Sequence, residues 1–173
     1  MHLYLVGFMG VGKSSVGHCL AGLLGWPFIS LDEEIEKREG KSIRDIFRQH
    51  GEGYFRAAEQ EELKRVSAGT PHVIAIGGGA FCDAENRRII KSTGKSIWLD
   101  APLDVIAARC EVDDSRPLFT TRSEMEALLE RRRPFYQEAA LHINVASLTV
   151  EAAARLILRA LDQSQTSDAG RRT

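Results

Sequence analysis

The stretch GFMGVGKS, residues 7–14, constrains the fold more than any other part of the chain. It matches the P-loop pattern G-x-x-x-x-G-K-[ST], in which a glycine-rich loop joins a strand to a helix. The apolar segment 3–6 precedes it and predicts a buried strand. Apolar residues at helical spacing follow it within 15–24 and predict a helix. The motif therefore lies in the local context that it requires.

The residue types of this loop suit the binding of phosphate. Gly10 and Gly12 allow backbone N–H groups to turn toward an anion, and the start of the helix adds a partial positive charge. We expect Lys13 to reach the β- and γ-phosphates and the Ser14 hydroxyl to hold Mg²⁺. The alternative is a plain glycine-rich turn followed by an unrelated Lys-Ser pair. We favour a site for ATP and Mg²⁺ with these contacts: Gly10, Val11, Gly12, Lys13, Ser14 and Ser15.

Composition restricts the other classes of function. The 173 residues suit one domain, and a net charge of −1 gives no basic field for nucleic acid or an anionic membrane. The loop begins too near Met1 for a secretory leader, and no apolar run approaches the length of a membrane span. Cys19, Cys82 and Cys110 lie far apart and are expected to be reduced thiols. We expect a cytoplasmic location and small-molecule partners only.

Strand and helix patterns alternate along the whole chain. Helices are expected between the strands, with Gly40 ending one, Ser42 and Thr149 capping others, and Pro134 ending the helix that starts at Glu124. We interpret 1–161 as a single domain and 162–173 as a flexible tail, because the last segment lacks large apolar residues. The strands after the first are expected at 27–31, 72–76, 96–99 and 141–145.

This alternation predicts an α/β fold, a parallel sheet with helices on both faces. In such sheets ligands bind beyond the carboxyl ends of the strands. The P-loop follows the first strand, Asp32 follows the second, and Gly77-Gly78-Gly79 follows the third. We therefore expect these three features to line one crevice.

Each of the last two features has a structural alternative. Asp32 is expected to bind magnesium, orient a hydroxyl or accept its proton, but an Asp in this position also caps helices. Three successive glycines remove side chains and let a substrate approach the backbone, yet they also suit a tight turn.

Arginines supply the remaining chemistry. Arg56, Arg116 and Arg132 stand outside simple salt-bridge runs, although 131–133 also suits a solvated helix face. Arginine binds a carboxylate through two parallel hydrogen bonds and stabilises charge on a transferring phosphoryl group. The polar segment 111–122 reads as a mobile lid that carries Arg116 over the phosphates.

Together these motifs resemble the shikimate kinase family of small P-loop kinases, over about residues 3–161. The P-loop alone would not single out this family. The more specific runs are GKSIxxIF at 40–47, GExxFRxxE at 51–59, GGGA at 77–80, RPL at 116–118 and RxPxY at 132–136.

The resemblance implies a three-layer sandwich of P-loop kinase type with strand order 2-3-1-4-5. It implies transfer of the γ-phosphate of ATP to the 3-hydroxyl of shikimate by a monomer, with the acid bound in a region of about 32–60. Arg56 and Arg132 would bind the carboxylate, and Arg109 would lie near the adenine. Asp32 and Gly77, Gly78 and Gly79 would meet the ring hydroxyls. The residues implied in catalysis are Lys13, Asp32 and Arg116.

One position departs from the family pattern. The family usually has Asp-x-Asp after the second strand, and here Ser30 takes the first place. Asp32 lies two residues on, so in a strand both side chains would point to one side. The departure puts metal affinity in question. It also leaves two alternatives, a catalytically inactive nucleotide- or shikimate-binding protein and another small P-loop kinase of a hydroxylated acid.

Overall fold

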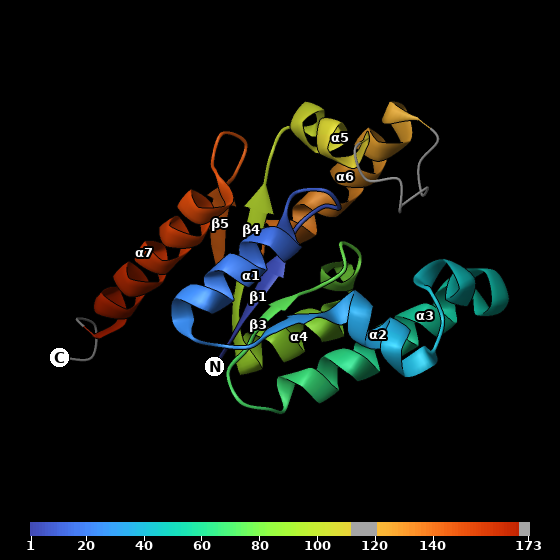
Figure 1. Ribbon diagram of the computed structural model, residues 1–173, viewed down its shortest axis with the longest axis horizontal. Coiled ribbons are helices and arrows are strands. Elements are labelled where there is room, and N and C mark those ends of the chain that lie inside the picture. Colours follow the sequence, from blue (N-terminus) through green and yellow to red (C-terminus); the bar gives the residue numbers. More distant parts are fainter. Residues whose placement is uncertain (112–120, 170–173) are drawn as a thin grey trace.

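The computed structural model describes residues 1–111 and 121–169. Its centre is a five-stranded parallel sheet with the order β2-β3-β1-β4-β5, which confirms the expected fold (Figure 1). The strands are β1 (His2–Val6), β2 (Phe28–Ser30), β3 (Val73–Ala75), β4 (Gly94–Asp100) and β5 (Leu141–Asn144).

Strand β1 is the middle of the sheet: it is buried along its length and pairs on both sides. All five of its residues are buried. Leu3 pairs with Val73 of β3 and with Lys95 of β4, and the register continues to Val6 opposite Trp98. The carboxyl end of β1 is thereby fixed between its neighbours, and it leads directly into the P-loop.

Helices cover the sheet on both faces. Helices α1 and α7 pack against each other on one face, and α3 contacts α4 on the other (Figure 1). Helix α2 packs on α3, and α5 contacts α6. Their bounds are α1 (Lys13–Leu24), α2 (Leu31–Glu39), α3 (Ile43–Ser67), α4 (Ala84–Thr93), α5 (Leu103–Glu111), α6 (Arg122–Tyr136) and α7 (Val150–Ala169), with a 3-10 turn η1 (Ala80–Cys82).

The predicted helix caps are confirmed. Gly40 ends α2 in the left-handed conformation. The Ser42 hydroxyl accepts the Asp45 N–H at 3.1 Å, and the Thr149 hydroxyl accepts the Ala152 N–H at 3.1 Å. Gly51 interrupts α3 with φ 78° and ψ 176°, a conformation that L-residues avoid, so the helix has two differently directed parts.

Several predicted boundaries differ from those in the structure by one or more residues. Helix α6 continues through Pro134 to Tyr136, because Tyr136 is buried and its packing offsets one lost backbone bond. Helix α7 continues past Leu161 to Ala169, so the tail predicted from 162 is helical over 162–169, a stretch with neither Gly nor Pro. Leu31 starts α2 instead of ending β2.

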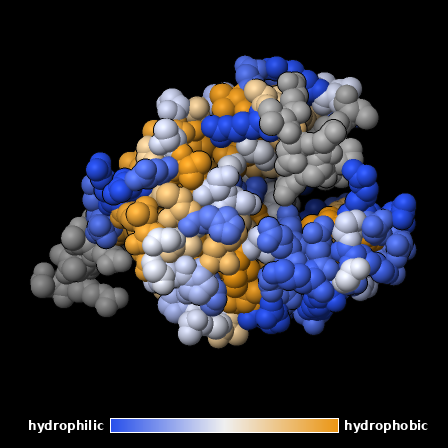
Figure 2. Space-filling model, in the orientation of Figure 1, coloured by the Kyte–Doolittle hydropathy of each residue, from blue (hydrophilic) through white to orange (hydrophobic). Residues whose placement is uncertain are grey.

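The surface is hollowed at the carboxyl end of the sheet. Figure 2 shows this hollow between the hydrophilic surface of α2 and α3 and the helices α5 and α6. Within the described residues, no helix combines the length and the apolar character needed to cross a bilayer.

A close backbone contact at the other end of the sheet gives a test of the fold. Gly94 begins β4 beside β1, and a Cβ there would lie 2.2 Å from the His2 carbonyl oxygen. Gly94→Ala must push the two strands apart, so we expect the free energy of unfolding to fall by about 1–3 kcal/mol.

Gly22→Ala is the matched control, measured by the same denaturant titration. Gly22 is exposed in α1, and its added Cβ would meet nothing within 4 Å. It should stabilise the helix by about 0.5–1 kcal/mol. Equal effects of the two variants would contradict the tight β1–β4 contact.

Candidate functional site

The P-loop leaves the start of α1 open to an anion. Gly12 is the N-cap, with φ 103° and no side chain to occupy the first backbone N–H groups, and the first turn of α1 has no acidic residue. The partial positive charge of the helix end is therefore neither capped nor neutralised there. The Lys13 ammonium donates to the carbonyls of Gly7 at 3.0 Å and Phe8 at 2.9 Å, which holds it across the loop.

A cavity of about 330 Å³ extends from the P-loop to the start of α2. Its size is at the lower end of the range for small-molecule sites. Besides loop residues, it brings together Ser30, Asp32 and Arg109, which come from three separate elements. The predicted crevice between the first and second strands is therefore present. The P-loop residues that line it are Gly10, Gly12, Lys13, Ser14 and Ser15.

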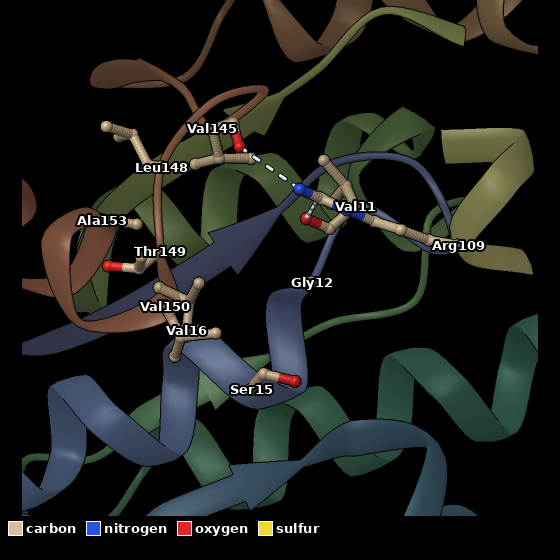
Figure 3. A pocket seen from close by; sticks show the side chains of 10 residues that line it. All are labelled: Val11, Gly12, Ser15, Val16, Arg109, Val145, Leu148, Thr149, Val150 and Ala153. Carbon is tan, nitrogen blue, oxygen red and sulfur yellow. Dashed lines mark hydrogen bonds between the residues drawn. The ribbon is translucent and has the colours of Figure 1, made fainter. Parts of the chain in front are cut away.

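A second cavity, of about 190 Å³, lies on the other side of the P-loop (Figure 3). Arg109 of α5 crosses it and donates to the carbonyl oxygens of Val11 at 3.0 Å and Val145 at 3.4 Å. Leu148 and Val150 give it an apolar wall. An apolar cavity beside a phosphate-binding loop suits a flat heterocycle. The hydrogen bond from Arg109 to Val11 connects this cavity to the loop.

The glycines 77–79 line neither of these cavities and lie among charged groups from three helices. A Cβ at Gly77 would lie 3.0 Å from an Asp32 carboxylate oxygen. One at Gly78 would lie 3.0 Å from the Arg132 guanidinium, and one at Gly79 only 2.6 Å from that of Arg56. Side chains on residues 77–79 would displace these charged groups. Only glycines at these positions leave room for the carboxylate and guanidinium groups that α2, α3 and α6 place there.

The P-loop and the triple-glycine turn lie side by side. Arg132 lies over the ring of Phe8 with 5.9 Å between the guanidinium carbon and the ring centre, a cation–π contact. A Cβ at Gly78 would also lie 3.3 Å from the Gly7 carbonyl oxygen. The P-loop and the triple-glycine turn therefore form adjoining walls.

Arg56 is held by two carboxylates on its own helix. It donates to Glu59 at 2.7 Å and to Glu52 at 3.2 Å. Glu59 is 1% exposed, and its other carboxylate oxygen has no hydrogen-bond partner in the described part of the chain. Burial raises the pKa of Glu59 to about 7, and the Arg56 guanidinium opposes this shift only in part.

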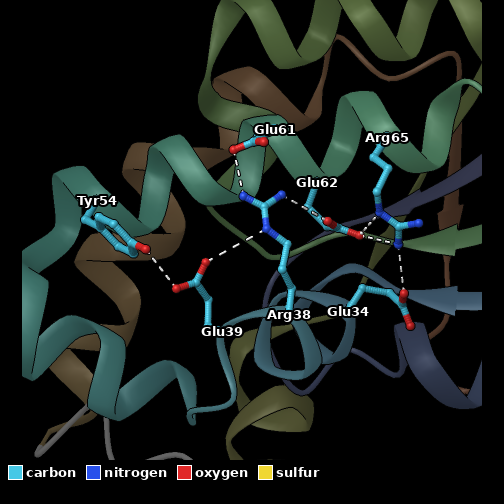
Figure 4. Close-up of polar contacts among 7 residues, drawn as sticks. All are labelled: Glu34, Arg38, Glu39, Tyr54, Glu61, Glu62 and Arg65. Atoms are coloured by element: carbon cyan, nitrogen blue, oxygen red, sulfur yellow. Dashed lines mark hydrogen bonds and ion pairs between the residues drawn. The ribbon is translucent and has the colours of Figure 1, made fainter.

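A network of ion pairs fixes α2, and with it Asp32, against α3 (Figure 4). The buried Glu62 carboxylate accepts from Arg38 at 3.4 Å and from Arg65 at 2.5 Å. Arg65 also reaches Glu34 at 2.9 Å, and Arg38 reaches Glu61 at 2.7 Å. Two arginines around one buried carboxylate satisfy its charge, so the two helices behave as one support.

Ser30 and Asp32 were expected to point to the same side because both would lie in one strand, and this reason is wrong. Ser30 is the N-cap of α2, and Asp32 lies in the first turn of that helix, so the two do not alternate along a strand. Both nevertheless line the larger cavity. The capping role considered for Asp32 belongs to Ser30, whose hydroxyl is 3.5 Å from the Glu33 N–H.

Sequence reasoning assigned no role to two residues at the turn, Glu59 and Tyr136. Glu59 shares the buried face of α3 with Phe55 and Leu63. Their helical spacing of four residues was the available signal. Tyr136 donates to the Gly78 carbonyl at 2.6 Å. Arg116 and most of the predicted lid lie at 112–120, outside the described residues.

Comparisons with known proteins agree with this geometry. Residues 9–162 match the family model for shikimate kinase. A shikimate kinase of Persephonella marina is 47% identical over 144 residues, which is 83% of this chain and 88% of that protein. The solved shikimate kinase of Acinetobacter baumannii, in complex with shikimate, has a TM-score of 0.90 at 35% identity and covers 94% of this chain and 93% of its own. The Aquifex aeolicus shikimate kinase has a TM-score of 0.85 at 38% identity, with 95% and 98% covered.

The buried carboxylate gives a pH test. Glu59 keeps its proton more strongly in the folded chain, with a pKa of about 7 against an ordinary 4.5. The unfolded chain therefore loses this proton first as the pH rises, and the free energy of unfolding should fall between those two values. Glu59→Gln should remove about 1–3 kcal/mol of that fall.

The measurement is urea unfolding at several pH values across this window. Glu126→Gln, at an exposed position of α6, controls for the loss of one carboxylate. If Glu59→Gln and Glu126→Gln give the same pH profile, Glu59 does not hold an extra proton in the folded state.

Proposed function

The chain belongs to the shikimate kinase family, an ATP-dependent phosphotransferase family that acts on shikimate, and we propose that its crevice divides the reaction between two walls. The P-loop wall takes the nucleotide, and the triple-glycine wall takes the acid. The observation that carries this proposal is the meeting of Asp32, Arg56 and Arg132 at residues 77–79, directly beside the P-loop.

On the nucleotide side, we assign the phosphates to the backbone of Gly10, Val11 and Gly12 and to Lys13 and Ser15. These residues surround the open end of α1. Lys13 would release the loop carbonyls and turn its charge to the β- and γ-phosphates, where it stabilises the transferring group. The adenine would lie in the smaller cavity against Arg109.

The donor set of the larger cavity fits Mg²⁺. It offers the hydroxyls of Ser14 and Ser30 and the carboxylate of Asp32, all oxygen ligands of the kind that this ion prefers. Ser14 would hold it directly, and the other two through water. When bound, the ion neutralises charge that develops on the phosphates.

On the acid side, we assign the shikimate carboxylate to Arg56 and Arg132 and the ring hydroxyls to Asp32 and the backbone of 77–79. Two guanidinium groups that converge on bare backbone suit a carboxylate on a ring. Asp32 would orient the 3-hydroxyl and accept its proton as the hydroxyl attacks the γ-phosphate. We assign Arg116 to the phosphates on the basis of the sequence alone. A cytoplasmic location and a monomeric state are proposed on the same basis.

The test is ADP release with ATP, Mg²⁺ and a panel of hydroxylated carboxylic acids. Shikimate should be the preferred acceptor. Arg132→Ala should raise the KM for shikimate about ten- to a hundred-fold and leave the KM for ATP nearly unchanged, because it removes a charge-assisted hydrogen bond worth about 1.5–3 kcal/mol.

Arg131→Ala is the matched control, since Arg131 is the exposed neighbour on the same helix. It should keep both constants. An equal rise of the two KM values in Arg132→Ala would remove Arg132 from the acid site, and a panel in which shikimate is inert would overturn the proposed function.

Ser30 allows a separate test of metal binding. Ser30→Asp adds a carboxylate to the larger cavity, and Asp is also a good N-cap, so α2 should keep its start. We expect half-maximal rate at a lower Mg²⁺ concentration with the KM for shikimate nearly unchanged. With ADP present, the rise in melting temperature caused by Mg²⁺ should likewise occur at a lower Mg²⁺ concentration than in the wild type.

Ser42→Asp serves as control, because it changes a second N-cap from Ser to Asp without reaching the larger cavity. If Ser30→Asp and Ser42→Asp have the same Mg²⁺ requirement, Ser30 does not lie near the metal.

A further inference from the structure

We propose that Tyr136 is a positioning residue for the acid site and acts through the Gly78–Gly79 peptide. This inference rests on the proposed function. It begins with a contact that no assigned role explains, the hydrogen bond of 2.6 Å from the Tyr136 hydroxyl to the Gly78 carbonyl.

The donor in this contact is fixed by its surroundings. The Tyr136 side chain is fully buried, and its ring packs against Trp98 of β4 with 6.0 Å between ring centres. Trp98 in turn stacks on His142 of β5, whose ring nitrogen lies 3.2 Å from Asp100. Tyr136 of α6 therefore packs its ring against the sheet and directs its hydroxyl to the turn. Burial raises the pKa of Tyr136, so the hydroxyl keeps its proton and remains a donor.

The acceptor is a peptide without side chains to orient it. Residues 77–79 are all glycine, and glycine leaves the backbone more conformations than any other residue. Within the described residues, neither the Gly78 nor the Gly79 N–H donates to a backbone carbonyl. Apart from the Cys82 thiol at 3.9 Å, Tyr136 is the group that holds the Gly78 carbonyl.

The hydrogen bond from Tyr136 to the Gly78 carbonyl also determines the direction of the Gly79 N–H. The described chain has no cis peptide bond, so the Gly79 N–H points opposite to the Gly78 carbonyl. Because Tyr136 draws the carbonyl toward α6 and the sheet, the N–H faces away from it. Arg56 lies close to Gly79, where a Cβ would be 2.6 Å from its guanidinium. The Gly79 N–H is thereby directed away from α6, at a residue that lies beside the Arg56 guanidinium.

Helix α6 supplies this contact together with a binding group. Arg132 and Tyr136 are four residues apart, so they lie on one face, and both reach Gly78. A Cβ there would lie 3.0 Å from Arg132 and 3.3 Å from the Tyr136 hydroxyl. One helix face therefore sets both the charge that binds the carboxylate and the direction of the peptide beneath it.

The experiment is Tyr136→Phe, which keeps the ring and removes the hydroxyl. We expect the KM for shikimate to rise about five- to ten-fold while the KM for ATP changes less than about two-fold. Hydrogen exchange in a peptide covering 77–82 should become faster without ligand. A purely structural role would not separate the two KM values.

Tyr4→Phe is the matched control. Tyr4 is equally buried, and its hydroxyl bonds Ser67 at 2.8 Å and Thr93 at 2.7 Å, at the ends of α3 and α4. It should lower the melting temperature and leave the ratio of the KM values unchanged. Equal KM changes in Tyr136→Phe, or unchanged exchange at 77–82, would overturn the inference. A wild-type chain that does not phosphorylate shikimate would instead overturn the proposed function.

Discussion

The absence of side chains at residues 77–79 is the constraint on which the acid half of the crevice depends. Charged groups from α2, α3 and α6 occupy the space that three Cβ atoms would take. Like and unlike charges then share a small volume: Asp32 and Glu59 meet near Gly77, while Arg56 and Arg132 face the next two residues. Burial is most costly for Glu59, and its ion pair with Arg56 offsets part of that cost.

Local signals predicted the parts of the fold that local chemistry decides. The P-loop, the buried first strand and the caps at Gly40, Ser42 and Thr149 follow from residue type and spacing. The meeting of the P-loop, Asp32 and the glycines followed from the rule that ligands bind at the carboxyl ends of parallel strands. The strand order came from family resemblance, because neighbours in a parallel sheet are set by long-range packing.

The features that were missed depend on tertiary contacts. Pro134 did not end α6, because the burial of Tyr136 outweighs one backbone hydrogen bond. Glu59 reads as a surface acid in sequence, and the packing of α3 against α2, α4 and η1 makes it a buried acid with a raised pKa. The capping by Ser30 depends on where β2 stops, and strand ends are the least certain part of a sequence pattern.

Helix α6 also limits how this chain can change in length. An α-helix turns by about 100° per residue, so one inserted or deleted residue between Arg132 and Tyr136 would move one of them off the face that meets Gly78. Pro134 lies between them at an exposed position. The residue count of this segment must therefore stay fixed over evolutionary time if both contacts with Gly78 are to persist.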